Sequence, residues 1–127
     1  MSAQDYVEIS SLMQAYADGL YHADSQALRQ VFHPNLAYVC ATPGDELHLD
    51  LEAYMARIDK RTPPSQTGDA RDDRVLEIKL ATPQLAHVTA SMALMGRTYL
   101  DLLTLQRTPE GWRIVTKVFS YVPMEKS

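Results

Sequence analysis

The fold is decided in the last third of the chain, where long β-type segments flank tight turns. Residues 91–105 read SMALMGRTYLDLLTL, residues 109–111 read PEG, and residues 112–121 read WRIVTKVFSY. Apolar, β-branched and aromatic residues of this kind are typical of strands. With a turn or bulge at Gly96 and a turn at 109–111, the stretch predicts three consecutive antiparallel strands.

The residues before this stretch add helices and further strands. Residues 4–22 have helical periodicity, with one apolar face made of Ile9, Leu12, Met13, Tyr16 and Leu20. Asp24 is expected to cap a short second helix that runs through Phe32 and stops before Pro34. A strand is predicted at 36–40, a third helix after Asp50, a polar loop at 62–73, and strands near 73–81, 84–95, 97–107 and 112–122.

This order predicts an α+β fold, one domain spanning 1–127, with helices packed on one face of a curved, mostly antiparallel sheet that encloses a pocket. Some predicted strands are apolar at nearly every position, as in residues 100–105. A strand with one face in water alternates instead, so both faces are expected to be covered. A second subunit is the expected cover of the outer face, with Thr98, Thr116, Val118 and Ser120 among the candidate contacts.

Composition excludes several classes of protein. Hydrophobic residues make up 46% of the chain and charged residues 22%, as in ordinary globular domains. The net charge of −4 argues against a nucleic-acid partner. No apolar run reaches the length of a membrane span, and no signal peptide precedes the first helix, so a cytoplasmic protein is expected. Cys40 is alone, and no histidine pair has metal-ligand spacing, so neither a metal nor a cofactor is expected.

Four segments carry a resemblance to a known superfamily: YADGL at 16–20, LRQVFHP at 28–34, YLDLL at 99–103 and GWRIVTKVF at 111–119. With the order of elements, they resemble the NTF2-like superfamily, and within it small bacterial proteins of the SnoaL-like and "putative lumazine-binding" type. The resemblance implies a cone of three N-terminal helices on a curved sheet, a pocket between them, and often a homodimer through the outer sheet face. It implies little about function, because one fold hosts unrelated activities.

The superfamily includes ketosteroid isomerases, and Tyr16 matches the helix-one tyrosine that donates a hydrogen bond to the developing oxyanion. The general base of that family would fall on or beside Cys40, and no carboxylate lies between Phe32 and Asp45. The isomerase mechanism is therefore expected to be absent. Superfamily dehydratases use histidine and aspartate, for which His48 and His87 are the candidates.

Asp101 and Lys117 are charged residues in otherwise apolar strands of one hairpin, where a charge is costly unless paired. One register places Asp101 opposite Lys117. Another pairs Leu102 with Lys117 and sends Asp101 to the other face. The sequence leaves this choice open, and with it the choice between a pocket pair and a structural or interface role.

Seven tyrosines against two Phe and one Trp suit a pocket for a flat ligand or a subunit interface. The expected ligand-binding residues are Tyr16, Tyr38, Tyr54, Lys117 and Tyr121, with Lys117 favouring anionic or carbonyl-bearing ligands. Three functions stay open: a small-molecule-binding protein, a cofactor-free lyase, isomerase or cyclase using Tyr16 or Asp101, and a dimerisation module with a vestigial pocket.

Overall fold

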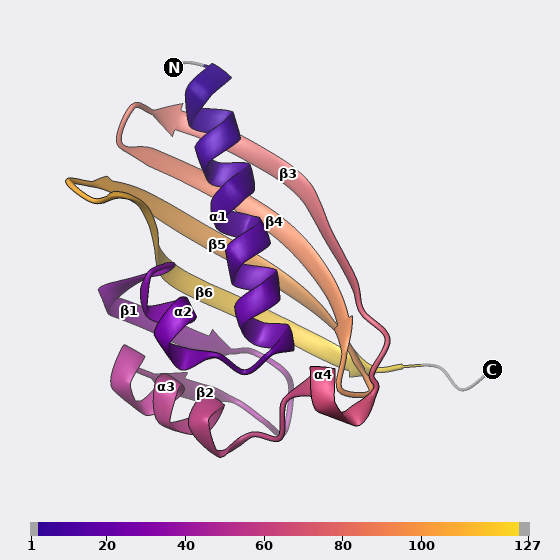
Figure 1. Ribbon diagram of the computed structural model, residues 1–127. Coiled ribbons are helices and arrows are strands. Elements are labelled where there is room, and N and C mark those ends of the chain that lie inside the picture. The colour runs from indigo at the N-terminus through magenta and orange to yellow at the C-terminus, as the bar shows by residue number, and fades with distance from the viewer. Residues whose placement is uncertain (1–2, 125–127) are drawn as a thin grey trace.

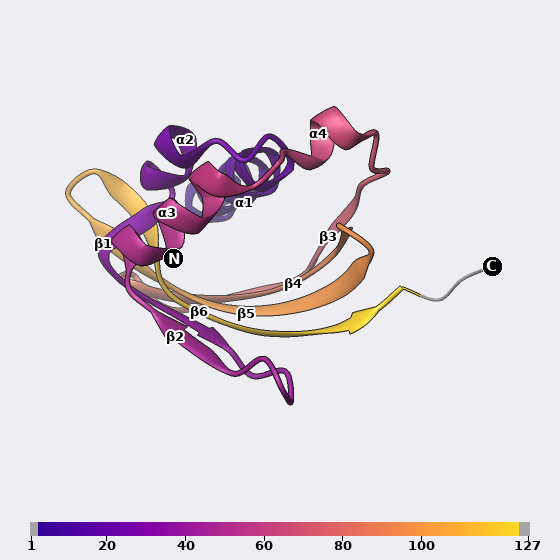
Figure 2. The same cartoon turned by 90° about the horizontal axis from the view of Figure 1, so that it is seen from below.

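A strongly curved sheet of six strands forms one layer of the molecule, and helices cover its concave face (Figures 1 and 2). The structure, a computed structural model, describes residues 3–124. The strands follow the order β2-β1-β6-β5-β4-β3, and every neighbouring pair is antiparallel except β1 with β6. The predicted α+β class and curved, mostly antiparallel sheet are confirmed.

The elements have the following bounds. The helices are α1 (Ala3–Tyr21), α2 (Ser25–Arg29), α3 (Leu51–Lys60) and α4 (Pro64–Thr67). The strands are β1 (Phe32–Cys40), β2 (Leu47–Leu49), β3 (Asp72–Thr82), β4 (Leu85–Leu94), β5 (Arg97–Thr108) and β6 (Gly111–Pro123). The last four strands agree with the sequence prediction to within two residues at each end.

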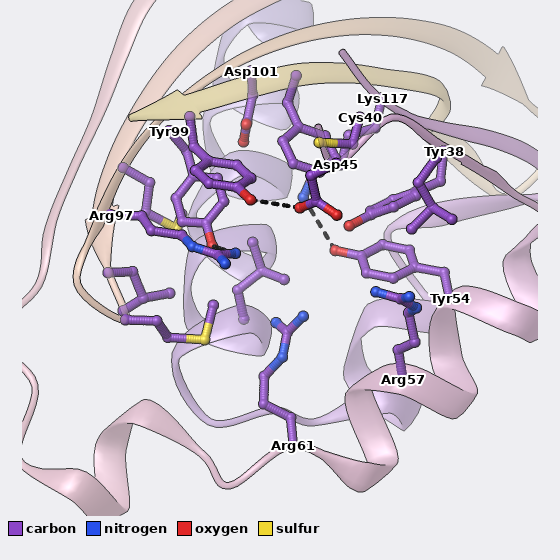
Figure 3. A pocket seen from close by; sticks show the side chains of 17 residues that line it. Tyr38, Cys40, Asp45, Tyr54, Arg57, Arg61, Arg97, Tyr99, Asp101 and Lys117 are labelled. Atoms are coloured by element: carbon purple, nitrogen blue, oxygen red, sulfur yellow. Dashed lines mark hydrogen bonds between the residues drawn. The ribbon is translucent and has the colours of Figure 1, made fainter. Parts of the chain in front are cut away.

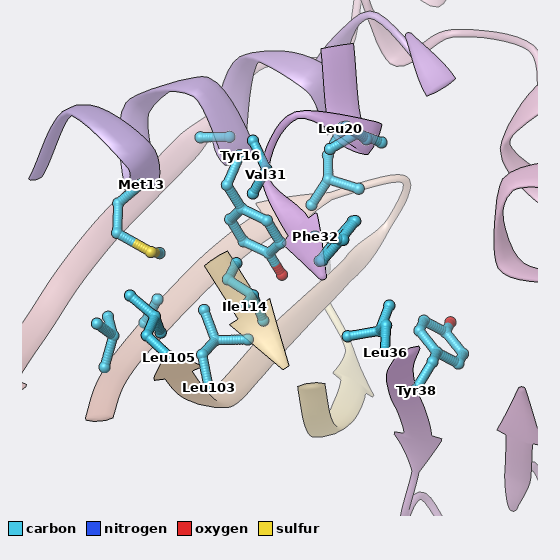
Figure 4. Close-up of a cluster of buried hydrophobic side chains, with 14 of the residues drawn as sticks. Met13, Tyr16, Leu20, Val31, Phe32, Leu36, Tyr38, Leu103, Leu105 and Ile114 are labelled. Atoms are coloured by element: carbon cyan, nitrogen blue, oxygen red, sulfur yellow. The ribbon is translucent and has the colours of Figure 1, made fainter. Parts of the chain in front are cut away.

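The core lies between α1 and the concave face of the sheet (Figure 4). The apolar stripe of α1 buries Ile9, Met13, Tyr16 and Leu20 there, as its periodicity predicted, and Leu12 is half-buried. Asp5 of α1 is buried as well, and Arg107 forms an ion pair with it while the indole N–H of Trp112 donates to it at 3.4 Å.

The second helix is shorter than predicted. It ends at Arg29, and Phe32 already belongs to β1. Pro34 does not end a helix but lies in an irregular part of the strand, where the register against β6 shifts between Phe32 and Ala37. Proline lacks the N–H that a ladder needs, so it fits such an irregular stretch.

Two short elements were missed by the sequence analysis. The edge strand β2 has three residues and pairs only with β1, which is too short for a periodic signal. The helix α4 lies in the segment predicted as a loop; Pro64 occupies its first turn, and Gly68, with φ of +75°, ends it in the left-handed region. The predicted count of three helices is therefore one short.

The β5–β6 hairpin has neither of the two registers considered from the sequence. Thr108 pairs with Gly111 across a two-residue turn, which by itself would pair Leu102 with Lys117. A bulge then shifts the ladder by one residue between Thr104 and Leu105. Leu103 consequently pairs with Lys117 and Asp101 with Phe119, so Asp101 and Lys117 share the concave face.

Candidate functional site

A pocket of about 360 Å³ opens between α3, the β1–β2 hairpin and the ends of β4, β5 and β6 (Figure 3). One wall is a chain of aromatic rings. Their centroids lie 4.1 Å apart for Tyr54 and Tyr38, 5.0 Å for Tyr38 and Phe119, 6.0 Å for Phe119 and Tyr99, and 5.5 Å for Tyr99 and Tyr121. Such a wall suits the face of a flat ligand.

Lys117 occupies the inner part of the pocket, and only 5% of its surface is exposed. Its ammonium donates to the Tyr54 hydroxyl at 3.1 Å. Its Nζ also lies 5.0–5.7 Å from the ring centroids of Tyr16, Tyr38, Tyr54 and Phe119. These rings offset part of the cost of burying the charge, and an ammonium has three protons to donate.

Asp101 lies in the same inner part and is 2% exposed. The hydroxyl of Tyr16 donates to its Oδ2 at 2.5 Å, while no group of residues 3–124 forms a hydrogen bond with its Oδ1. Among the ion pairs of residues 3–124, none of 4.0 Å or less joins Asp101 to Lys117. A buried carboxylate oxygen without a partner is rare in folded proteins and calls for an explanation.

Burial keeps three tyrosines of this region protonated. It raises the pKa of Tyr38 to about 12, and the charge of Lys117 opposes that rise. Burial likewise raises the pKa of Tyr54. The pKa of Tyr16 is raised by burial and further by the carboxylate of Asp101. At neutral pH all three therefore present hydroxyl groups, not phenolates.

The outer part of the pocket carries positive charge. Arg57, Arg61 and Arg97 line it, and their side chains reach toward the centre (Figure 3). Asp45 also lines it and accepts a hydrogen bond from the Tyr121 hydroxyl at 2.5 Å. With Lys117, four cationic side chains face two carboxylates, although the whole chain has a net charge of −4.

The residues expected from the sequence lie as follows. Tyr38, Tyr54, Lys117 and Tyr121 line the pocket, as does Asp101. Tyr16 is fully buried and does not line the pocket, but its hydroxyl donates to Asp101 and its ring centroid lies 5.0 Å from the Nζ of Lys117. The three arginines, Asp45 and Tyr99 were missed. Tyr54 and Arg57, three residues apart, share one face of α3, and Arg61, four residues further on, caps the end of this helix; the spacing was a signal that was available.

Other candidates lie elsewhere. Cys40 lines the pocket, but His48 and His87 do not: each alternates with a neighbour that faces inward, Leu47 and Ala86 respectively. Within residues 3–124, no group of three His, Cys, Asp or Glu side chains is arranged to hold a metal ion.

Residues 4–120 match the family described as "putative lumazine-binding". The chain belongs to this family. Among curated proteins none matches it. No helix in the described part of the chain has the length and hydrophobicity needed to cross a membrane.

Solved structures show the same fold. An NTF2-like protein of unknown function from Shewanella baltica has a TM-score of 0.85 at 18% identity, with 98% of each chain covered. One from Silicibacter pomeroyi scores 0.83 at 19% identity and covers 96% of this chain and 100% of its own. A ketosteroid isomerase-like protein from Erwinia carotovora scores 0.75 at 13% identity, covering 97% and 100%. Together with the family match over residues 4–120, these structures confirm the expected NTF2-like superfamily, while the structural likeness by itself concerns the fold alone.

The three buried tyrosines predict a loss of stability in alkaline solution. An unfolded tyrosine has a pKa of about 10, and burial raises the native pKa of Tyr16, Tyr38 and Tyr54 above that value. Above the unfolded pKa the unfolded chain binds fewer protons than the native one. The free energy of unfolding should then fall by about 1.4 kcal/mol per pH unit for each such tyrosine.

Urea unfolding between pH 9 and pH 11 measures this slope. Tyr38→Phe should lower this slope by up to about 1.4 kcal/mol per pH unit, the contribution of one such group. Tyrosinate absorbance provides the control. If all the tyrosines of the native protein ionise near pH 10, the account of their burial is wrong.

Proposed function

We propose that the protein binds a small molecule in this pocket, with Asp101 and Lys117 contacting its inner end. The observation that carries the proposal is the unpartnered Oδ1 of Asp101, buried beside an ammonium that has one hydrogen bond. Buried polar groups with unfilled hydrogen-bonding capacity destabilise a protein unless something satisfies them. A ligand that donates to Asp101 and accepts from Lys117 would do so.

Two further features support this proposal. The pocket volume of about 360 Å³ lies in the range of small-molecule sites. The description of the family, "putative lumazine-binding", also refers to a small organic ligand. Neither feature identifies the compound, but both favour an occupied pocket over a vestigial one.

Filling the pocket should abolish binding. Leu47 lines the pocket from the edge strand β2, whereas its neighbour His48 is exposed on the other face. Native mass spectrometry of the purified wild type should show a bound small molecule. Leu47→Trp should lose this extra mass, His48→Trp should retain it, and Lys117→Met should reduce its occupancy.

Both tryptophan variants change the same strand, so the pair separates the pocket from general effects on β2. Retention of the small molecule by Leu47→Trp would place it outside the pocket and contradict the proposal. Equal occupancy in Lys117→Met and wild type would refute the role of the lysine.

A cofactor-free isomerase or lyase is the second candidate, favoured by the hydrogen bond between Tyr16 and Asp101. The free Oδ1 of Asp101 would remove a proton from a carbon next to a carbonyl group, and the electron pair would move to the carbonyl oxygen as an enolate. The ammonium of Lys117 would stabilise that oxygen, and Tyr16 would hold the carboxyl group in place.

This candidate predicts proton exchange on a simple ketone. Proton NMR of 2-tetralone in D₂O should show α-proton exchange that is faster with the wild type than with Asp101→Asn. The control is the uncatalysed rate in buffer. Equal exchange rates for the wild type, the variant and buffer would exclude this catalytic activity, and small-molecule binding would remain as the proposed function.

We also propose a homodimer formed through the convex face of the sheet. Leu100 and Leu102 are 45% and 43% exposed there, and Leu102 pairs with Val118 across the hairpin. Thr98, Val118 and Ser120 are exposed and Thr116 is half-buried, all on strands whose inward positions are buried. No helix covers this face in Figure 2. A second copy would bury these apolar side chains.

Light scattering should find a dimer for the wild type at micromolar concentration and a monomer for Leu102→Glu, because a buried unpaired carboxylate disfavours association. Val7→Glu is the matched control, since Val7 is exposed on α1 at the other side of the molecule. A monomeric wild type would end this proposal.

A further inference from the structure

Three arginines at the outer part of the pocket lack carboxylate partners. All eight arginines of the chain lie in the described residues 3–124, and four form ion pairs with aspartate or glutamate: Arg29, Arg71, Arg74 and Arg107. The other four have no such pair within 4.0 Å in this part of the chain. Three of them line one pocket, and the fourth, Arg113, does not.

The three side chains come from two elements and meet in one space (Figure 3). Arg57 and Arg61 are one turn apart at the end of α3, and Arg97 begins β5. Arg97 is held in place, since its guanidinium carbon lies 4.0 Å from the Tyr121 ring centroid and its Nη1 donates to the Tyr99 hydroxyl at 3.4 Å. These contacts orient a cation without neutralising it.

The carboxylates of the pocket do not neutralise this group. Asp45 is bonded to Tyr121 and Asp101 to Tyr16, and neither forms an ion pair within residues 3–124. Three like charges around one opening repel each other, and the carboxylate of Asp45, which attracts Arg97, does not by itself balance them. A bound anion would.

We propose that Arg57, Arg61 and Arg97 form an oxyanion subsite, and that the ligand is a flat ring compound carrying a carboxylate or a phosphate group. The inference rests on the proposed binding function and adds the chemical class of the ligand. The ring packs against the wall of Tyr38, Phe119 and Tyr99. The planar guanidinium groups bind the oxyanion through paired N–H donors.

Three probes of one ring system test this class: 2-naphthoate, 2-naphthyl phosphate and the neutral 2-naphthamide. Titration calorimetry with the wild type should give an affinity for at least one of the two anions about tenfold higher than for the amide, a gap that shrinks as salt is added. The stronger of the two anions identifies the oxyanion. Because only the probe changes, this comparison cannot fail through misfolding.

Variants then assign the subsite. Arg61→Gln and Arg97→Gln should each weaken binding of the preferred anion about fivefold to tenfold and leave the affinity for 2-naphthamide unchanged. Arg113→Gln is the matched control, because it removes the same charge outside the pocket and should change neither affinity. Circular dichroism verifies that each variant is folded.

The outcomes separate this inference from the binding function. If the amide binds as tightly as both anions and Leu47→Trp abolishes all three, the pocket binds ligands but the oxyanion subsite is wrong. If none of the probes binds, the proposed class of ligand is wrong. The binding function is then tested separately, by whether native mass spectrometry finds a bound small molecule. If Arg113→Gln weakens anion binding as much as Arg61→Gln does, the effect is one of net charge and the subsite is refuted.

Discussion

The pairing of β5 with β6, interrupted by a single bulge, is the constraint on which the rest of the site depends. Val115 is the extra residue, since Thr104 pairs with Thr116 and Leu105 with Ile114. Before the bulge the inward positions of β6 are Trp112 and Ile114, and after it they are Lys117 and Phe119. With Val115 in a regular ladder and no bulge, the period of two along the strand would direct Lys117 to the convex face. The bulge therefore brings an ammonium into the pocket that contains Asp101.

The inner part of the pocket contains buried charged groups, which a protein core normally lacks. Asp101 and Lys117 are more deeply buried than charged residues normally are, yet they do not pair with each other. The hydroxyls of Tyr16 and Tyr54 and the faces of four aromatic rings satisfy them in part. Such incompletely satisfied charges lower the stability of the fold, and proteins keep destabilising features of this kind mainly at functional sites. This makes the inner part a place where a ligand contributes the missing contacts.

Arginines outside the pocket and arginines at the pocket differ in the groups that they contact. Outside the pocket, four of the five arginines are matched by nearby carboxylates, as in the bidentate contact of Arg29 with Glu52. At the pocket, Arg97 faces the ring of Tyr121 and the hydroxyl of Tyr99 instead, and Arg57 and Arg61 form no ion pair with a carboxylate of residues 3–124. A chain with a net charge of −4 thus contains one opening of positive potential, which would attract anionic ligands selectively.

The sequence by itself determined the class of fold and the positions of most elements, because periodicity and turn residues act over a few neighbouring residues. The stripe of α1, the cap at Asp50 and the four last strands all follow from such local patterns. It also indicated Tyr38, Tyr54, Lys117 and Tyr121 as residues of the pocket wall. Short elements such as β2 and α4 carry too few residues for a pattern, so they were missed.

Only the tertiary structure decided which of these residues act together. A bulge of one residue is invisible in the alternation of β6, yet it selects the face on which Lys117 lies. Likewise, Arg57 and Arg61 at the end of α3 line the same pocket as Arg97 of β5, although these residues are far apart in the chain. Such contacts depend on the curvature of the sheet and on side-chain packing. Local propensity has no information about either, and the chemistry of the site therefore emerges only when the chain is folded.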